Sequence, residues 1–273
     1  MMMSWERQIT IKSASELELM RTAGKINAEA LAAARDITRP GVSTADLNAA
    51  AEEVLKKYGV YSPFLNYPGP YPYPASTNVS VNEELVHGIP SLKRKLREGD
   101  IVSVDCGNVY EGFVADSALT IRVGEVSEHV EKLLEVTENA LYVGISKMVP
   151  GNRVGDISAA IQQYVESHHL QVTREYTGHG VGRQMHEGPQ VPNYGTPGHG
   201  MLLREGMTLA LEPMVLMHSP ATRVLADEWT VVSRDGLPTA HYEHTVAITA
   251  QGPRILTLLE DGKSPGRIQF DQV

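Results

Sequence analysis

The sequence predicts an α+β domain made of two similar halves, in which helices flank a central antiparallel sheet. Three observations predict it: a motif that occurs twice, a long helical stretch before each copy, and apolar strands that end in acidic residues after each copy. Of the 273 residues, 42% are hydrophobic, which is enough for a sizeable core. We expect one domain at 11–258, with halves at about 11–125 and 126–258, a lead-in at 1–10 and a loose tail at 259–273.

Each predicted half begins with a long helical stretch, 15–35 in the first and 128–147 in the second, where apolar residues recur at helical spacing. A Pro-Gly turn follows each stretch, at Pro40-Gly41 and at Pro150-Gly151. An acidic residue, Asp46 or Asp156, then stands close to the start of another predicted helix. Each half therefore opens with two helices.

Strands that end in a carboxylate follow in each half. Leu96-Arg97-Glu98-Gly99 precedes an apolar run that ends at Asp105, and Leu203-Arg204-Glu205-Gly206 precedes one that reaches Glu212. Two halves related by pseudo-symmetry would have Asp105 and Glu212 at equivalent positions across a shared sheet. The repeat predicts a site at the junction of the halves.

The segment 107–116 is typical of a hairpin that turns at Glu111-Gly112. With a two-residue loop, Gly107 pairs with Asp116, and side-chain alternation puts Asp105 on the same face. Diagonal neighbours lie roughly 7–8 Å apart at the backbone, so both carboxylates can reach metal ions spaced ~3.5–4 Å apart. This pair needs a cation to offset its repulsion.

The second half also has acidic residues on apolar strands. Glu212 lies in the apolar run 208–216, and Glu243 lies in a predicted strand after the Asp235-Gly236 turn. One such acid alone is as readily a structural carboxylate hydrogen-bonded to backbone or paired with Arg. Four acidic residues on apolar strands together predict a metal site. Oxygen ligands with one imidazole suit Mn, Fe(II), Co or Zn rather than a cysteine-rich zinc site.

The imidazole candidate is His179, in the expected glycine loop 178–182, where small residues let the backbone approach a site. The loop lacks the preceding strand and the following Lys-Ser or Lys-Thr of a phosphate loop. His87 and His186 each stand beside glycine and proline. The Pro- and Tyr-rich run 67–74 is incompatible with a central strand and predicts a loop at the rim.

Composition excludes several classes of protein. A net charge of -9 argues against nucleic-acid binding, which needs clustered Lys and Arg. The single cysteine, Cys106, fits a reducing compartment, and alternation points it away from the face of Asp105 as a buried hydrophobe. No apolar run approaches the ~20 residues of a membrane span, and the start lacks a signal-peptide core. We expect a cytoplasmic protein.

The ordered set Asp105, Asp116, His179, Glu212 and Glu243 resembles that of the type I, bacterial-like methionine aminopeptidases, metallopeptidases whose fold is called pita-bread. The resemblance runs from about 11 to 257. It rests on motifs distributed through the chain: His87-Gly88-Ile89-Pro90, Asp105-Cys106-Gly107-Asn108, Gly112-Phe113-Val114-Ala115-Asp116, Thr177-Gly178-His179-Gly180, Glu212-Pro213-Met214 and Tyr242-Glu243-His244-Thr245.

The resemblance implies two divalent metal ions, Co, Mn, Fe(II) or Zn, with Asp116 and Glu243 bridging them. Asp105 would complete one ion, and His179 with Glu212 the other. It further implies three catalytic residues: Glu212, which accepts and returns a proton, and His87 and His186, which contact substrate near the scissile bond. The pocket for the Met side chain would be lined by Tyr73, Asn78, Met185 and Trp229.

Four positions depart from the family pattern. Met185 stands where an aromatic residue is common, Asn78 and Val86 where Cys is frequent, and His241 where Gln is common beside Glu243. The five implied metal ligands are intact. The departures bear on the shape of the pocket.

The implied activity is removal of the N-terminal methionine from nascent proteins and from peptides with a small second residue, by water activated at two metal ions. Partners would be such chains, with transient ribosome proximity, and the enzyme would be a monomer. One alternative is an Xaa-Pro peptidase or creatinase-like hydrolase, but those relatives usually carry a sizeable extra N-terminal domain. Another is a non-catalytic pita-bread binding module, against which the complete ligand set argues.

Overall fold

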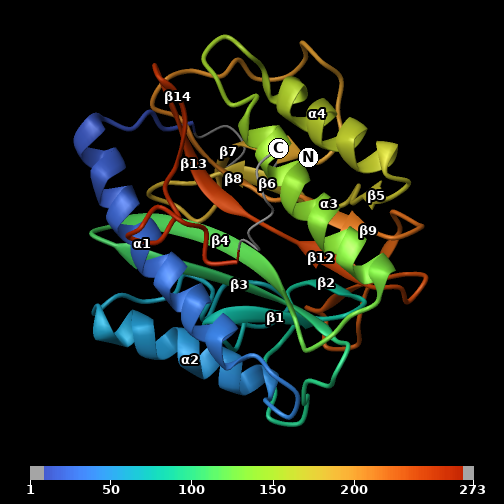
Figure 1. Cartoon of the computed structure of the whole chain (residues 1–273). Helices are drawn as coiled ribbons and strands as arrows, with labels where there is room; N and C mark the ends of the chain where they lie inside the picture. Colours follow the sequence, from blue (N-terminus) through green and yellow to red (C-terminus); the bar gives the residue numbers. More distant parts are fainter. Residues whose placement is uncertain (1–8, 267–273) are drawn as a thin grey trace.

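The computed structural model describes residues 9–266, and two helices open its first half (Figure 1). Helix α1 begins after Ser13, whose hydroxyl accepts from the Glu16 amide while Glu16 accepts from the Ser13 amide. The elements of this half are α1 (Ala14–Ile37), α2 (Thr44–Lys57), β1 (Thr77–Val81), β2 (Glu84–Val86), β3 (Ile101–Tyr110) and β4 (Phe113–Arg122).

The second half repeats this order of helices and strands. Its elements are α3 (Glu128–Ile145), α4 (Val154–Ser167), β5 (Gln171–Val172), β6 (Thr177–Gly180), β7 (Glu187–Pro192), β8 (Thr208–Leu211), β9 (Met214–Leu216), β10 (Thr222–Val224), β11 (Val231–Ser233), β12 (Thr239–His241), β13 (His244–Thr249) and β14 (Gly252–Ile255). The four predicted helices are confirmed, with small differences at their ends.

The sequence repeat is visible in the backbone. Gly41 and Gly151, in the two Pro-Gly turns, have φ angles of 89° and 94°, and Gly99 and Gly206 have 85° and 83°. These left-handed values favour glycine at each equivalent turn. Asp46 and Asp156 accept hydrogen bonds from the amides of Ser43 and Arg153 at the starts of α2 and α4. The equivalent turns of both halves thus share one geometry.

The strands also follow one order in both halves. Three antiparallel strands in the order β1-β3-β4 correspond to β6-β8-β13, the centre of a five-stranded sheet with the order β14-β13-β8-β6-β7. Two smaller antiparallel sheets, β10-β11-β2 and β12-β9-β5, complete the strand layer. The predicted fold class, two pseudo-symmetric halves with antiparallel strands and flanking helices, is confirmed. The domain boundaries stay a prediction.

The two halves meet where β4 runs beside β13. Ala118 and Glu243 exchange both backbone hydrogen bonds, and the Thr245 hydroxyl bonds to the backbone N–H and C=O of Asp116. The Thr120 hydroxyl bonds in the same way to the backbone of His241. The three pairs advance by two residues on each side, so the acidic residues of the two halves come to one seam.

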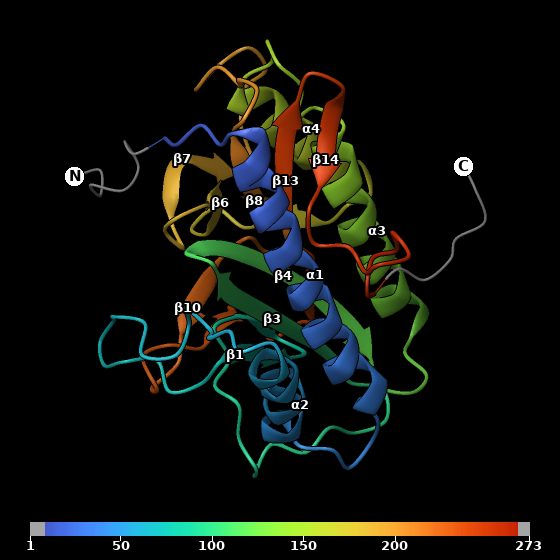
Figure 2. The same ribbon diagram turned by 90° about the vertical axis from the view of Figure 1, so that its left-hand side faces the viewer.

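The helices cover this strand layer, as Figures 1 and 2 show, with α1 and α2 against the first half and α3 and α4 against the second. Apolar side chains of both halves form one main core, which includes Leu31, Val104, Leu133, Ile157 and Leu209. One core is therefore continuous through both halves.

Some local predictions differ from the structure. The expected glycine loop 178–182 is strand β6 as far as Gly180, since β8 and β7 pair with it on either side. Residues 67–74 form no strand, as predicted. In the predicted tail, Pro265 is buried and its carbonyl accepts from Arg35, whereas 267–273 and most of the lead-in lie outside the described residues.

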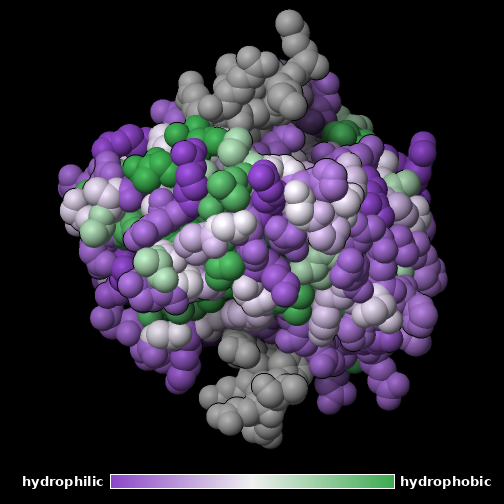
Figure 3. Space-filling model, turned by 90° about the horizontal axis from the view of Figure 1, so that it is seen from above, coloured by the Kyte–Doolittle hydropathy of each residue, from purple (hydrophilic) through white to green (hydrophobic). Residues whose placement is uncertain are grey.

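Polar and apolar residues are interspersed on the face shown in Figure 3. Within residues 9–266, no helix has the length and apolar content to cross a membrane.

Candidate metal centre

The β3–β4 hairpin brings together the two acids of the first half. Gly107 pairs with Asp116 and Asp105 pairs with Ala118, the register that the sequence predicts. The turn residues Glu111 and Gly112 both have positive φ angles, 49° and 77°, as in a two-residue turn that matches the strand twist. Asn78, opposite Asp105 on β1, donates to Asp105 Oδ2 at 2.8 Å.

The acids of the second half lie at equivalent interruptions between strands. Glu212 lies between β8 and β9, and Glu243 between β12 and β13. The prediction that Glu243 lies within a strand was wrong, because the ladder is broken at this point. Its backbone still pairs with Ala118, which fixes the position of the side chain.

His179 reaches the acids from β6. A Cβ on Gly178 would lie 2.6 Å from the Ala210 carbonyl oxygen, and one on Gly180 would lie 2.1 Å from that of Gly188. Only glycine lets β6 lie so close to its neighbours. His179 Nδ1 donates to the Gly180 carbonyl at 2.8 Å, which leaves Nε2 unprotonated.

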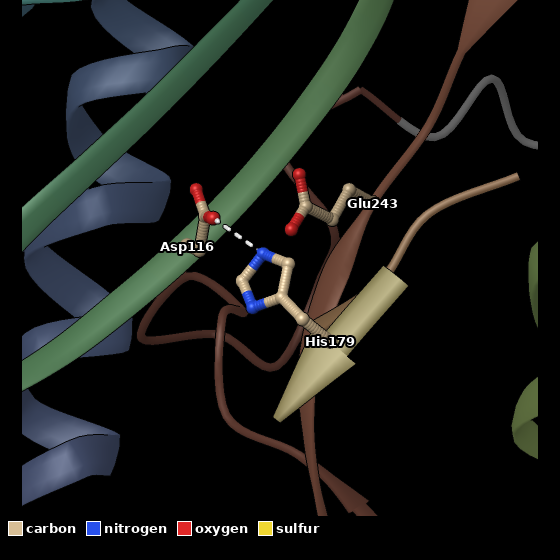
Figure 4. A group of neighbouring side chains, drawn as sticks. All are labelled: Asp116, His179 and Glu243. Atoms are coloured by element: carbon tan, nitrogen blue, oxygen red, sulfur yellow. Dashed lines mark ion pairs between the residues drawn. The ribbon is translucent and has the colours of Figure 1, made fainter. Parts of the chain in front are cut away.

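The side chains converge on one small volume. His179 Nε2 lies 3.7 Å from Asp116 Oδ2, as drawn in Figure 4 with Glu243 alongside, and 3.5 Å from Glu212 Oε1. Two groups of three, Asp116 with His179 and Glu243, and Glu212 with His241 and Glu243, have donor atoms within 4.8 Å of one another. Glu243 belongs to both groups.

Burial raises the pKa values of these carboxyl groups. Burial raises the pKa of Asp105 to about 7, although the Asn78 hydrogen bond opposes the shift. Asp116 and Glu243 are each 2% exposed, and burial together with the neighbouring carboxylates raises their pKa values well above the ordinary range. The pKa of Glu212 is raised by burial and by Asp105. The four carboxyl groups together therefore disfavour further negative charge at this position.

These atoms fit a bound cation. Within residues 9–266, no Lys or Arg pairs with the four carboxylates, and Asp116, Glu212 and Glu243 lie instead beside the rings of His179 and His241, whose pKa values burial lowers to about 3. Oδ1 of Asp105, Oδ1 of Asp116 and Oε1 of Glu243 are buried and have no hydrogen-bond partner in the described part of the chain. Buried carboxylates need compensation, and divalent metal ions provide it with this donor set.

Two further histidines border the cluster. The His186 ring lies 4.4 Å from the His179 ring, and its Nδ1 is 2.6 Å from the Tyr67 hydroxyl. His87 has a positive φ of 60°, uncommon for histidine, and its ring contacts Tyr176 and Trp229 edge-on. Burial lowers the pKa values of His87 and His186 to about 4, so both rings are neutral at pH 7.

An apolar cluster adjoins these histidines. It contains three of the four residues expected to line a pocket, Tyr73, Met185 and Trp229, together with Phe64 and Ala75. The Tyr73 and Trp229 rings lie 5.1 Å apart, edge to face. The fourth, Asn78, donates a hydrogen bond from its side-chain amide to Asp105.

Lys12 is a structural partner of this region that the sequence did not indicate. Its Nζ lies 2.8 Å from Glu187 Oε2, with the two side chains 3% and 2% exposed. Glu187 also accepts from Thr10 and from the Arg183 and Gln184 amides, so it holds the 183–187 loop that contains Met185 and His186. No local pattern pairs residues so distant in sequence.

His241 is the second residue whose position the sequence left open. The sequence marks it only as a departure from the family pattern. In the structure it is 2% exposed and lies beside Glu212 and Glu243. Its spacing of two residues from Glu243 was the available signal. Burial lowers the pKa of the His241 imidazole to about 3.

Comparison with known proteins gives consistent matches. The profile of Metallopeptidase family M24 matches residues 18–250. A methionine aminopeptidase of Clostridium acetobutylicum is 50% identical over 252 residues, which cover 92% of this chain and 100% of that protein.

Solved structures agree with these matches. The crystal structure of methionine aminopeptidase from Thermotoga maritima has a TM-score of 0.89 and 48% identity, and the match covers 91% of this chain and 99% of that one. A prolidase from Pyrococcus furiosus has a TM-score of 0.72 at 24% identity, covering 92% of this chain and 66% of that one, and shows a shared fold alone.

Proposed function

The chain belongs to metallopeptidase family M24, and from this premise we propose that it is a methionine aminopeptidase. It would release the N-terminal methionine from nascent proteins and peptides with a small second residue. The observation that carries the proposal is the buried group of four carboxylates and His179, without Lys or Arg among residues 9–266 to neutralise it. Support comes from the 50% identity to a methionine aminopeptidase over nearly the whole chain.

The proposed ligands are the five residues that the family resemblance implies. Asp116 and Glu243 would bridge the two divalent ions, Asp105 would complete one, and His179 with Glu212 would complete the other. Divalent ions held there would make water nucleophilic at neutral pH and polarise a peptide carbonyl. Co, Mn, Fe(II) and Zn all suit this donor set.

The chain's own residues would supply the remaining steps. Glu212 accepts a proton from the attacking water and returns it to the leaving amine. With the Tyr67 hydroxyl as donor to His186 Nδ1, 2.6 Å away, the imidazole proton would lie on Nε2, the nitrogen suited to donate to a developing oxyanion. His87 would contact the substrate near the scissile bond and help position it.

Substrate selection would rest on the apolar cluster beside the histidines. Tyr73 and Trp229 offer ring edges, and Met185 offers a polarisable wall, each of which suits the thioether of a methionine. Asn78 would border the same pocket while it holds Asp105. We further propose that the protein is a cytoplasmic monomer that acts on nascent chains near the ribosome.

A competition assay tests the activity. Chelator-stripped protein is reconstituted with Co, Mn, Fe(II) or Zn in turn and given a Met-Ala-Ser peptide and an Ala-Pro peptide together, while bound metal is counted. Metal-dependent release of methionine alone is expected. Cleavage before proline would favour an Xaa-Pro peptidase, and stoichiometric metal without cleavage would favour a binding module.

A further inference from the structure

The side chain of His241 lies on the metal-facing side of the seam. It ends β12, two residues before Glu243, and its Nε2 lies 3.7 Å from Glu243 Oε2, so the two side chains share one side of the seam. The Thr120 hydroxyl accepts from the His241 amide and donates to its carbonyl, both at 2.9 Å, and Ser103 bonds to that hydroxyl at 2.9 Å. This clamp fixes the backbone from which the ring projects.

One nitrogen of the His241 ring has no hydrogen-bond partner among residues 9–266. This Nε2 is buried, and it lies 3.8 Å from Glu212 Oε2 and 3.7 Å from Glu243 Oε2. Hydrogen bonds of N–H to O are about 2.7–3.2 Å long, so both separations are too long. Donors bound to one ion at about 2.0–2.2 Å lie up to roughly 4 Å apart, so three such atoms can surround an ion.

Resting on the proposed function, we propose that His241 Nε2 is a second imidazole donor to the metal pair, on the ion held by Glu212 and Glu243. Four carboxylates and two imidazoles then hold the pair, rather than four carboxylates and His179 alone. Imidazole suits Fe and Zn, whereas carboxylate suits Mn. His241 therefore shifts the preference of the centre away from Mn.

Counting coordinated imidazoles in the intact protein tests the proposal. In protein loaded with Co(II), each bound imidazole keeps one ring N–H, whose proton resonance is shifted far outside the normal range and disappears in D₂O. Two such resonances are expected, one from His179 and one from His241. A single resonance in fully loaded, active protein would overturn the role of His241.

His241→Gln removes the imidazole but keeps a side chain able to donate a hydrogen bond. We expect one of the two shifted resonances to vanish and the affinity for Fe(II) or Zn to fall about tenfold or more, with a smaller change for Mn. If His241 were only a hydrogen-bond donor, the resonance count would be the same in the variant and the wild type.

His244→Gln is the matched control. His244 is also buried, at 3% exposed, but its Nδ1 lies 2.8 Å from the Thr257 hydroxyl and it belongs to neither donor group. Both shifted resonances should persist in this variant. If loss of His244 removed a resonance and loss of His241 did not, the assignment would be wrong.

Failure of this inference can be distinguished from failure of the proposed function. Protein that binds no Co(II) would contradict the proposed function itself. Protein that binds Co(II) and releases methionine with one shifted resonance would contradict only the second imidazole. Because the wild-type count needs no substitution, misfolding of His241→Gln leaves the test decisive.

Discussion

Two buried acidic centres lie close together in this molecule, and they differ in the source of their cation. Glu187 is paired with buried Lys12, and although burial alone would raise its pKa, hydrogen bonds from Lys12 and Thr10 hold that pKa below its ordinary value. Asp116 and Glu243 are buried to a similar extent, yet their pKa values are raised. The chain supplies its own cation to one centre and leaves the other for an external ion.

The two centres are joined through one peptide bond. His186, which borders the metal centre, precedes Glu187 directly, so the Lys12 ion pair positions a residue of the other site. The paired centre serves the structure, and the unpaired one is available for chemistry. Four changes test this division, from the largest expected effect to the smallest.

Asp116→Asn should have opposite effects on metal binding and on the stability of the metal-free protein. We expect loss of bound metal and a fall in methionine release of about 10³-fold or more, since metal chemistry supplies several kcal/mol. Without metal, removing one of four mutually repelling carboxylates should raise the melting temperature. Metal content, turnover and melting with chelator measure these effects, and full hydrolysis by the variant would contradict the ligand assignment.

Glu187→Ala should destabilise the protein whether or not metal is bound. It leaves Lys12 buried without its partner, and breaking a buried ion pair costs about 3–5 kcal/mol of unfolding free energy. Glu18→Ala, which removes an exposed pair with Arg254, should cost at most about 1 kcal/mol and serves as the control. Equal losses in denaturant titrations would show that the Lys12 pair is no more than a surface pair.

His186→Ala should reduce turnover without changing metal content. The loss of a hydrogen-bond donor to a developing oxyanion predicts a fall in kcat of about 10²-fold. Steady-state kinetics and metal analysis check this, with His199→Ala on an exposed loop as the control. Normal turnover would remove His186 from the proposed catalytic group.

Lowering the pH should weaken metal binding at the unpaired centre. Because burial raises the pKa of Asp105 to about 7, its metal-free carboxyl group holds a proton below that pH, and an entering ion must displace it. The apparent affinity should fall about tenfold per pH unit below pH 7 for each proton displaced. Calorimetry in two buffers of different ionisation enthalpy counts these protons. A metal affinity that does not change between pH 6 and 7.5 would contradict the prediction.

Much of the site could be predicted from sequence because its parts follow local rules. A two-residue turn fixes the register of β3 and β4, and alternation then puts Asp105 and Asp116 together. The repeat relates Glu212 to Asp105 in the same way. The family resemblance supplied the roles of these residues and of His179, which spacing alone leaves open.

The remainder depends on contacts between segments distant in sequence. The Lys12 pair and the clamp of Thr120 on His241 form only when the halves meet, and no periodicity signals either. Glu243 was assigned to the strand expected after the Asp235-Gly236 turn, whereas the ladder breaks beside Ala118. Sequence patterns describe each half better than they describe the seam.

The pairing of Glu243 with Ala118 has a consequence for how a new copy of this protein matures. Chains emerge from the ribosome N-terminus first, and contacts between distant segments form late. All four other acidic or imidazole ligands of the proposed set are translated before Glu243. A nascent copy therefore has no complete centre until Glu243 has been translated and released, and the full metal site can form only after the strands of the two halves have met.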